Sequence, residues 1–370
     1  MNALRCRDIR QCGGLCFHHP RRFSGFSLIE LMIAVTLGML AVAAVGSVFI
    51  YGSRSYKQDD KVSRMQDELR FAMAQLSADL EMAGFWAQIN NPAGTGVITI
   101  DPSALPLGTD CGPTLDGGGA TNTNNWVYNE RRAAIATRGN ALSGFDAASA
   151  FPCIANDEFQ PDTDIVAVKY LGDATTSPET GKVYLRTNGV QSTIYRHGGG
   201  PPGPTGTNVT IYPYRVSVWY IRRWSVNSAE NPRIPSLCRK VLNSTPTMAG
   251  DTGGCIAQGI EDMQLEFGLD IAANPDGIAD IFTENIAWPG ATVAERTAFA
   301  AVMARVVAVR VHLLARSSQS DAPAGYRNEK SYTLASKVIA ATNDGYYRKT
   351  LSTVVLLRNQ ANRLNPFALP

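Results

Sequence analysis

Hydrophobic and polar positions follow two successive patterns in the first quarter of the chain. From Phe26 to Tyr51 the residues form one apolar run, longer than the roughly 20 residues that a membrane-spanning helix needs. After Arg54, apolar residues recur at steps of three or four with charged residues between them, which predicts an amphipathic continuation of the helix. We expect this stripe to pack on the protein's own sheet rather than in an intermolecular coiled coil, and we expect Gly84 to end the helix. The stripe consists of Val62, Met65, Leu69, Met73, Leu76, Leu80 and Ala83.

The rest of the chain alternates between turn-rich and strand-like segments. Residues 87–150 are rich in Gly, Asn, Thr, Pro and Ala, which predicts a long connection with little regular structure. Residues 292–303 are good helix formers, and residues 304–315 alternate apolar positions with Arg310 and His312, as in a strand with one core face. Further strands are predicted at 164–170, 182–186, 207–212, 215–224, 256–269 and 352–358. These elements predict an α+β fold, a long N-terminal helix packed on a mainly antiparallel β-sheet with long loops.

Charge and cysteine content place the two ends of the apolar run on opposite sides of a membrane. Residues 1–25 carry five arginines and one aspartate, whereas the remaining residues are net negative within a total of +2. The positive-inside rule therefore predicts residues 1–25 in the cytoplasm and everything after Tyr51 outside it. Three of the seven cysteines precede Gly25, and an even number follows it.

The four later cysteines are Cys111, Cys153, Cys238 and Cys255. None has zinc-ligand spacing, so we expect disulfides formed in an oxidising compartment. Sequence proximity favours Cys238 with Cys255, which leaves Cys111 with Cys153. Buried free thiols remain the alternative.

Glu30 is an unpaired carboxylate inside the apolar run. Such a charge in hydrocarbon costs on the order of 2.5 to 3.5 kcal/mol on insertion scales, less near an interface. A cut after Gly25 would create an α-amino group on Phe26, which could compensate Glu30 in the same chain or in a neighbouring subunit. The alternative is that Glu30 reaches the headgroup region by itself.

Residues 25–30, Gly-Phe-Ser-Leu-Ile-Glu, resemble the processing motif of type IV prepilins. The resemblance implies that a prepilin peptidase cleaves between Gly25 and Phe26, that Phe26 is N-methylated, and that Glu30 serves filament assembly. The later part of the chain resembles the PilW group of minor pilins. That resemblance is carried by residues 259–270, 274–280, 306–316 and 351–359.

These resemblances imply a pilin-like organisation and a structural function. Residues 1–25 are the leader that is removed, 26–53 the transmembrane half of the helix, 54–86 its amphipathic half, and 87–370 an extracytoplasmic β-rich domain. The implied function is that of a minor pilin in the tip or priming complex of a type IV pilus, which supports pilus assembly, adhesion and twitching motility. The implied partners are the prepilin peptidase, other minor and major pilins, and the inner membrane before assembly. A minor pseudopilin of type II secretion and a calcium-dependent tip adhesin remain alternatives.

Candidate chemistry outside the helix is sparse. One loop is rich in side-chain oxygens that could bind calcium, from Asp270, Asn274, Asp276 and Asp280. The EF-hand calcium-binding pattern fails at both of its charged ends. We therefore prefer the interpretation that this segment is a β-turn to the interpretation that it binds calcium. Residues 212–224 interleave aromatics with arginines, as in a single-stranded nucleic-acid platform, yet such strands are common and we do not expect nucleic acid as a partner. Serine-hydrolase, zinc-protease, P-loop and dinucleotide motifs do not occur. We therefore expect no enzymatic activity and no cofactor.

Overall fold

A computed structural model describes residues 25–89, 98–101, 134–138, 153–155, 157–198, 203–206, 208–242, 248–250, 255–284, 302, 304–322 and 325–364. It contains two compact units, one up to Gln58 and one from Asp59 onward. Cys111 and nearly all of the predicted helix 292–303 lie outside the described residues.

Helix α1 (Leu28–Met82) contributes to both units. It confirms the predicted continuous helix and ends two residues before Gly84. Gly84 has φ 70°, the left-handed conformation that glycine adopts without steric cost at a helix end, and its amide donates to the Lys169 carbonyl at 3.0 Å. The predicted stripe is buried from Met65 onward, so it packs within the protein's own globular unit.

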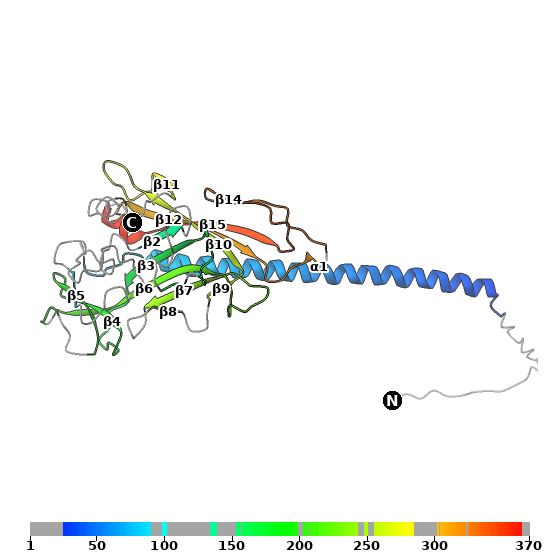
Figure 1. Cartoon of the computed structure of the whole chain (residues 1–370), viewed down its shortest axis with the longest axis horizontal. Helices are drawn as coiled ribbons and strands as arrows, with labels where there is room; N and C mark the ends of the chain where they lie inside the picture. Colours follow the sequence, from blue (N-terminus) through cyan, green and yellow to red (C-terminus); the bar gives the residue numbers. More distant parts are fainter. Residues whose placement is uncertain are drawn as a thin grey trace, which may run out of the picture. The chain divides into compact units, whose positions relative to one another are not determined.

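A large sheet follows the helix, with strand order β1-β5-β4-β6-β3-β2; β7 also pairs with β6, and β8 and β9 pair with β7 (Figure 1). Strand β1 pairs parallel with β5, and the other described pairings in this sheet are antiparallel. The strands are β1 (Ile98–Ile100), β2 (Ala134–Arg138), β3 (Asp164–Leu171), β4 (Val183–Thr187), β5 (Ser192–Arg196), β6 (Thr210–Arg222), β7 (Ser236–Leu242), β8 (Met248–Gly250) and β9 (Ala257–Gln258).

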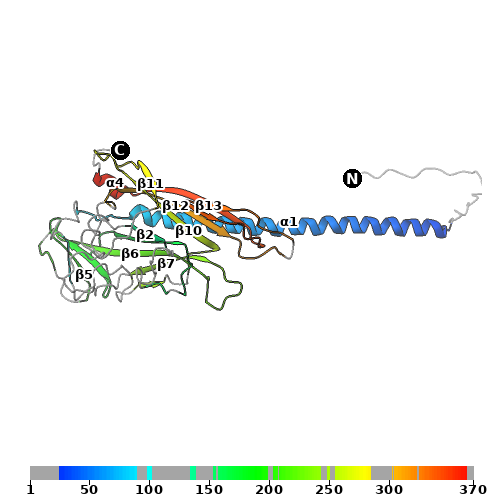
Figure 2. The same ribbon diagram turned by 45° about the horizontal axis from the view of Figure 1, so that its top comes forward.

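A second, C-terminal sheet has the order β11-β10-β12-β15 and is antiparallel throughout its described pairs. Its strands are β10 (Ile260–Leu269), β11 (Ile281–Thr283), β12 (Val306–Arg316) and β15 (Arg348–Leu356). A small hairpin of β13 (Tyr332–Leu334) and β14 (Lys337–Ile339) lies between β12 and β15 in sequence. The short helix α4 (Arg358–Leu364) follows β15 and is drawn near β11 in Figure 2.

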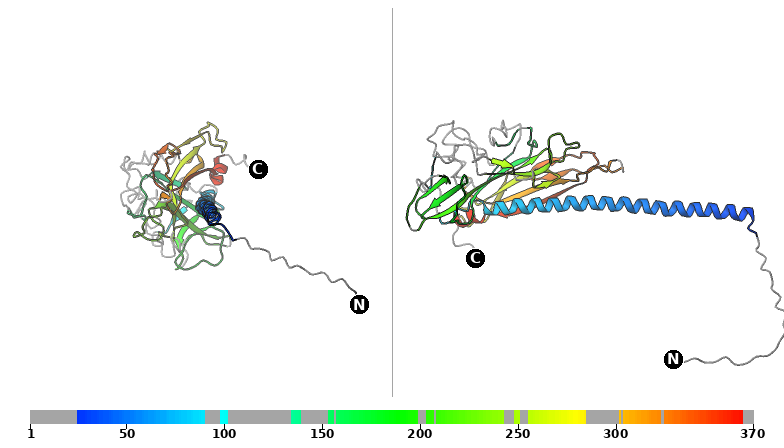
Figure 3. Two further views of the ribbon diagram at one scale, coloured as in Figure 1. Left: turned by 90° about the vertical axis from the view of Figure 1, so that its right-hand side faces the viewer. Right: turned by 90° about the horizontal axis from the view of Figure 1, so that it is seen from below.

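Two hydrophobic clusters hold the globular unit together. One joins the buried stripe of α1 to β3, β6, β7, β10, β12 and β15, so both sheets pack against this part of the helix (Figure 3). The other lies on the opposite face of the large sheet and includes Trp86 and Ile89, just after α1. The α+β, mainly antiparallel fold expected from the sequence is therefore confirmed.

Several strand boundaries differ from the expectation. The predicted strands 207–212 and 215–224 are one strand, β6, whose pairing continues across Pro213: Tyr214 pairs with Leu171 of β3, and Pro213 pairs with Tyr184 of β4. The Pro213 carbonyl accepts from the Gly172 amide at 2.9 Å. The predicted strand 256–269 is divided into β9 and β10 at Gly259, which has φ 74° and whose absent Cβ would lie 2.4 Å from the Arg316 carbonyl oxygen.

Other elements were missed. Strands β1 and β2 lie within the segment 87–150, which was expected to lack regular structure, and β15 begins four residues before the predicted strand 352–358. Strand β2 pairs antiparallel with β3 along its whole length, so a long-range partner stabilises a segment whose own composition favours loops.

Candidate assembly surface

The helix begins just after the predicted cleavage position. Ser27 precedes α1, and its carbonyl accepts from the amides of Glu30 and Leu31 at 3.0 and 3.1 Å. Glu30 therefore lies in the first turn, where a carboxylate favourably faces the unpaired amides and the positive end of the helix dipole. Gly25 and Phe26 lie immediately before this turn, so the structure places all three predicted processing and assembly residues at one helix terminus.

The first half of α1 exposes its apolar side chains. Phe26 is 81% exposed and Phe49 76% exposed. An 18-residue window of α1 has a mean hydropathy of 2.4 and no buried residue, and among the described residues this is the helix that is long and apolar enough to span a membrane. From Leu28 to Tyr51 it would rise about 36 Å at 1.5 Å per residue, enough for the roughly 30 Å hydrocarbon core. This segment requires lipid or other apolar helices around it.

Polar side chains within this segment are satisfied by the helix itself. The Thr36 hydroxyl donates to the carbonyls of Met32 and Ile33 at 3.0 and 2.9 Å, and the Ser47 hydroxyl donates to the Ala44 carbonyl at 2.8 Å. These bonds remove the cost of exposing a hydroxyl to hydrocarbon. Glu30 is then the charged side chain between Leu28 and Tyr51, and no bond within the helix offsets the cost of placing its charge in hydrocarbon.

The second half of α1 carries a buried carboxylate, Asp79, that binds the large sheet. It accepts hydrogen bonds from Tyr170 on β3 at 3.1 Å and from Ser217 and Trp219 on β6 at 2.8 Å each. Arg239 on β7 lies 3.5 Å from Asp79 and 5.1 Å from the Trp219 ring. Burial, followed by the Asp79 charge and hydrogen bond, raises the pKa of Tyr170 to about 12, so its hydroxyl stays a donor.

The end of α1 is capped by a residue from far along the chain. The Asn359 amide, in α4, lies 3.2 to 3.5 Å from the carbonyls of Glu81, Met82 and Ala83. These are carbonyls that a helix cannot satisfy itself. Near the start of the globular unit, Lys61 forms an ion pair with Asp321. The part of α1 within the globular unit is therefore bound to the rest of that unit by polar contacts near both of its ends.

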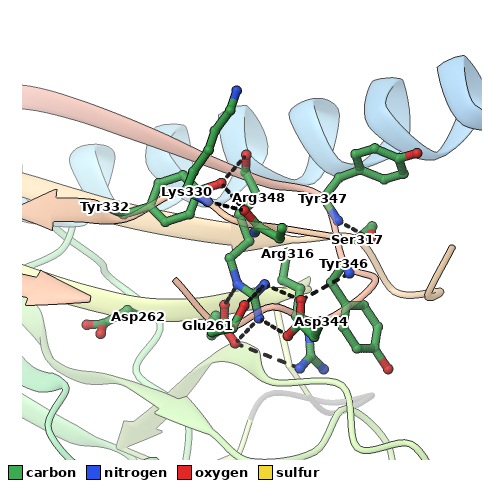
Figure 4. A network of polar contacts seen from close by, with 12 residues as sticks. Glu261, Asp262, Arg316, Ser317, Lys330, Tyr332, Asp344, Tyr346, Tyr347 and Arg348 are labelled. Atoms are coloured by element: carbon green, nitrogen blue, oxygen red, sulfur yellow. Dashed lines mark hydrogen bonds and ion pairs between the residues drawn. The ribbon is translucent and has the colours of Figure 1, made fainter. Parts of the chain in front are cut away.

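A charged network around Arg348 joins β15 to β10 and to the preceding loop (Figure 4). The Arg348 side chain is 2% exposed. It binds Glu261 at 2.6 and 3.0 Å and Asp344 at 2.7 and 2.8 Å. Burial alone would raise the pKa of Asp344, but hydrogen bonds from Arg348 and the Tyr346 amide outweigh it and hold that pKa below its usual value. The two carboxylates accept hydrogen bonds from one guanidinium and fix the loop geometry.

The carboxylates of the oxygen-rich loop accept hydrogen bonds from backbone amides of the same loop. Asp280 accepts from the amides of Ile271 and Ala272, and Asp270 accepts from the amide of Gly277. Arg305 donates to the carbonyls of Asp270 and Ala272 at 3.1 and 2.8 Å. Among the described residues no group of three or more His, Cys, Asp or Glu could hold a metal. The geometry agrees with the preferred β-turn interpretation, and calcium stays an alternative without a built site.

One predicted cysteine pair is present in the structure. Cys238 on β7 is bonded to Cys255, the pairing that sequence proximity favoured. Cys153 is also disulfide-bonded. Disulfides form and persist mainly in oxidising compartments.

The aromatics between 212 and 224 do not form an exposed platform. Tyr212, Tyr214, Trp219 and Tyr220 are buried, so they are unavailable for base stacking. Arg222 donates to the carbonyls of Trp224 and Ser225. These aromatics are buried because β6 is a central strand with both faces covered.

His312 lies on the polar face of β12, as predicted. Its Nε2 is 2.8 Å from Glu266 and its Nδ1 is 2.8 Å from Ser352. Arg310 also binds Glu266, at 3.0 Å. This cluster links the β10, β12 and β15 strands through side chains.

Comparison with known proteins gives two family matches. Residues 218–359 match the model for Type IV Pilus-assembly protein W, and residues 20–46 match the prokaryotic N-terminal methylation motif. The first match runs from the end of β6 through β7 to β15 and ends at Asn359, the residue that caps α1. The second covers Gly25, Phe26 and Glu30.

One solved structure is similar, the Type IV-like pilin TTHA1219 from Thermus thermophilus. The two share 10% identity over 54% of this chain and 80% of that one, with a TM-score of 0.26. A comparison with curated proteins found no match.

Proposed function

We propose that this chain, which matches the PilW model over residues 218–359 and the N-terminal methylation motif over residues 20–46, is a type IV pilus minor pilin of the PilW group that acts in the tip or priming complex of a type IV pilus. There it takes part in pilus assembly and thereby in adhesion and twitching motility. The motif implies processing by a prepilin peptidase and other pilins as partners. The proposed role is structural rather than enzymatic.

The observation that carries this proposal is the contrast between the two halves of α1. Residues after Asp59 have a buried stripe, whereas no residue of the apolar window near the N-terminus is buried. An apolar helix of this length is stable in a bilayer before assembly and in a bundle of like helices afterward. We place the chain in the inner membrane with its globular unit in the periplasm, and then on the surface of the assembled pilus.

In the proposed assembly step, Glu30 determines which stagger between neighbouring helices is favoured. Cleavage between Gly25 and Phe26 leaves an α-amino group close to the positive end of the helix dipole, which is unfavourable for a cation. A carboxylate from a neighbouring helix offsets both charges only when the two helices are correctly staggered. We propose that Glu30 and the N-methylated Phe26 form this pair between adjacent subunits.

Mass spectrometry of the protein from a piliated host tests processing directly. We expect a mature chain that begins at N-methylated Phe26 and is recovered in sheared pili in small amounts relative to the major subunit. A chain that keeps residues 1–25 in a cell with an active prepilin peptidase would contradict the proposal. Recovery only with secretion-system pseudopilins would favour the type II secretion alternative.

A further inference from the structure

A polar cavity lies at the β1–β5 edge of the large sheet. It has a volume of about 440 Å³, within the range of small-ligand clefts, roughly 300 to 1,000 Å³. Its walls come from β1, from the β4–β5 turn, from β5 and from residues 203–205 before β6. Strands β4 and β5 lie beyond the C-terminal end of α1, at the end of the globular unit away from Asp59 (Figures 1 and 2).

The lining is built from hydroxyl and amide groups. It includes Thr99, Asn188, Gln191, Thr193 and Thr205, and none of the described residues that line it is charged or aromatic. These described residues therefore offer no counter-charge to an ionic ligand and little apolar surface to an apolar one. A ligand rich in neutral hydroxyl groups can both donate to and accept from such walls.

Some of this hydrogen-bonding capacity is unused. Asn188 accepts from the amides of Val190 and Gln191 through Oδ1, at 3.0 and 2.8 Å, and within the described part of the chain its amide nitrogen makes no hydrogen bond. Thr99 donates to the Ser192 carbonyl at 3.1 Å and lies 2.9 Å from the Thr193 hydroxyl. Thr193 must therefore donate to Thr99, which leaves its acceptor lone pairs available.

The loop over Thr193 depends on a glycine. Gly203 has φ 107°, and a Cβ at this position would lie 2.6 Å from the Thr193 hydroxyl oxygen. A residue without a side chain lets the backbone approach this close and form the wall. The cavity is thus part of a defined turn geometry.

We infer that this cavity binds a neutral saccharide unit, such as the terminus of a surface glycan. Sugar hydroxyls match the mixed donors and acceptors of the walls, and the absence of charged lining disfavours acidic sugars. Saccharide binding is a property of the single chain and does not depend on the proposed function. Only its biological use, in adhesion, rests on the proposed function.

The test uses the mature full-length chain in a zwitterionic detergent without a sugar headgroup. The chain is applied to immobilised neutral and acidic oligosaccharides, and hits are measured again by calorimetry with the free sugar. Thr193→Val and Thr205→Val should each weaken binding roughly 10-fold through loss of a hydroxyl at nearly constant volume. Thr350→Val, an exposed position on β15, is the matched control and should bind as the parent does.

Three results would overturn the inference: no saccharide bound at millimolar concentration, binding confined to acidic saccharides, or equal binding by the cavity variants. Thr205 is exposed, so its variant remains informative if Thr193→Val folds poorly. Incorporation into pili, measured on the same variants, should be unchanged, which separates failure of this inference from failure of the proposed function.

Discussion

The carboxylate of Asp79 on α1 accepts a 2.8 Å hydrogen bond from the indole nitrogen of Trp219 on β6, and both residues are buried. The same carboxylate binds Ser217 and Tyr170, so one helix residue satisfies donors from two strands. A buried charge is tolerated when its lone pairs are filled in this way. The helix is therefore positioned on the sheet by directional bonds as well as by apolar contact.

Replacing this carboxylate should destabilise the globular unit strongly. Asp79→Leu leaves the donors of Trp219, Ser217 and Tyr170 unpaired, and we expect a loss of ~3 to 5 kcal/mol in the free energy of unfolding. Urea unfolding of the full chain in micelles, followed by tryptophan fluorescence, measures it. Asp67→Leu, on the exposed side of α1, is the control and should change stability by less than about 0.5 kcal/mol. Equal stability of the two variants would show that Asp79 is not needed to dock the helix.

The sequence predicts the helix and several buried strands, such as β3 and β12, because their signals are local, but it missed the buried strands β5 and β7. A three- or four-residue step identifies the stripe that includes Leu69 and Leu76, and alternation identifies β12. The left-handed conformation at Gly84 follows from the same local chemistry. The predicted processing residues Gly25 and Phe26 and the predicted assembly residue Glu30 also come from a contiguous motif.

The polar contacts that complete the fold are not local, and they were missed. Asp79 looks like one more charge on an amphipathic helix, and its partners Tyr170 and Trp219 lie 91 and 140 residues away in sequence. Asn359 caps α1 across 278 residues. Nothing in the sequence near either residue marks such a partner, because the pairing depends on which strands neighbour the helix.

The Arg348 network should require the planar guanidinium and not only a positive charge. Arg348→Lys cannot bind Glu261 and Asp344 bidentately at once, and we expect a loss of ~2 to 3 kcal/mol in the free energy of unfolding. Arg358→Lys, an exposed position at the start of α4, should have little effect. Matching unfolding midpoints for these two variants would contradict the role of the network.

Acid should weaken the same network. The pKa of Asp344 is held below its usual value, so its contribution to stability is fully present above the unfolded pKa near 3.8 and is lost as pH falls through the lower, folded pKa. Asp344→Asn should therefore be less stable than the parent at pH 7 and should lose less stability on acidification. The two unfolding midpoints should approach each other as the pH falls below 3.8. A difference that stays constant from pH 7 to pH 2 would argue against an ionised Asp344.

Removing the Cys238–Cys255 bond should lower stability moderately. It closes a short segment, with a sequence separation of 17, and a loop of this size contributes roughly 3 kcal/mol by restricting the unfolded chain. The Cys238→Ala, Cys255→Ala double variant should therefore unfold at lower urea concentration. Reducing agent should also lower the unfolding midpoint of the parent. Any further decrease that reducing agent causes in the double variant reports the contribution of the remaining disulfide at Cys153. An unchanged midpoint in the double variant would show that the bond is not structural.

Glu30 distinguishes processing from assembly. Gly25→Ile should leave an uncut precursor in the membrane, because the peptidase motif is lost before any assembly step. Glu30→Val should be cleaved normally, since Gly25 and Phe26 remain, but should be depleted from sheared pili because no carboxylate offsets the neighbouring Phe26 amine. Glu30→Gln keeps the size and polarity without the charge, so depletion equal to that of Glu30→Val assigns the effect to charge. Immunoblots of membrane and pilus fractions measure all three, and normal incorporation of Glu30→Val would show that this subunit enters the filament by helix packing alone.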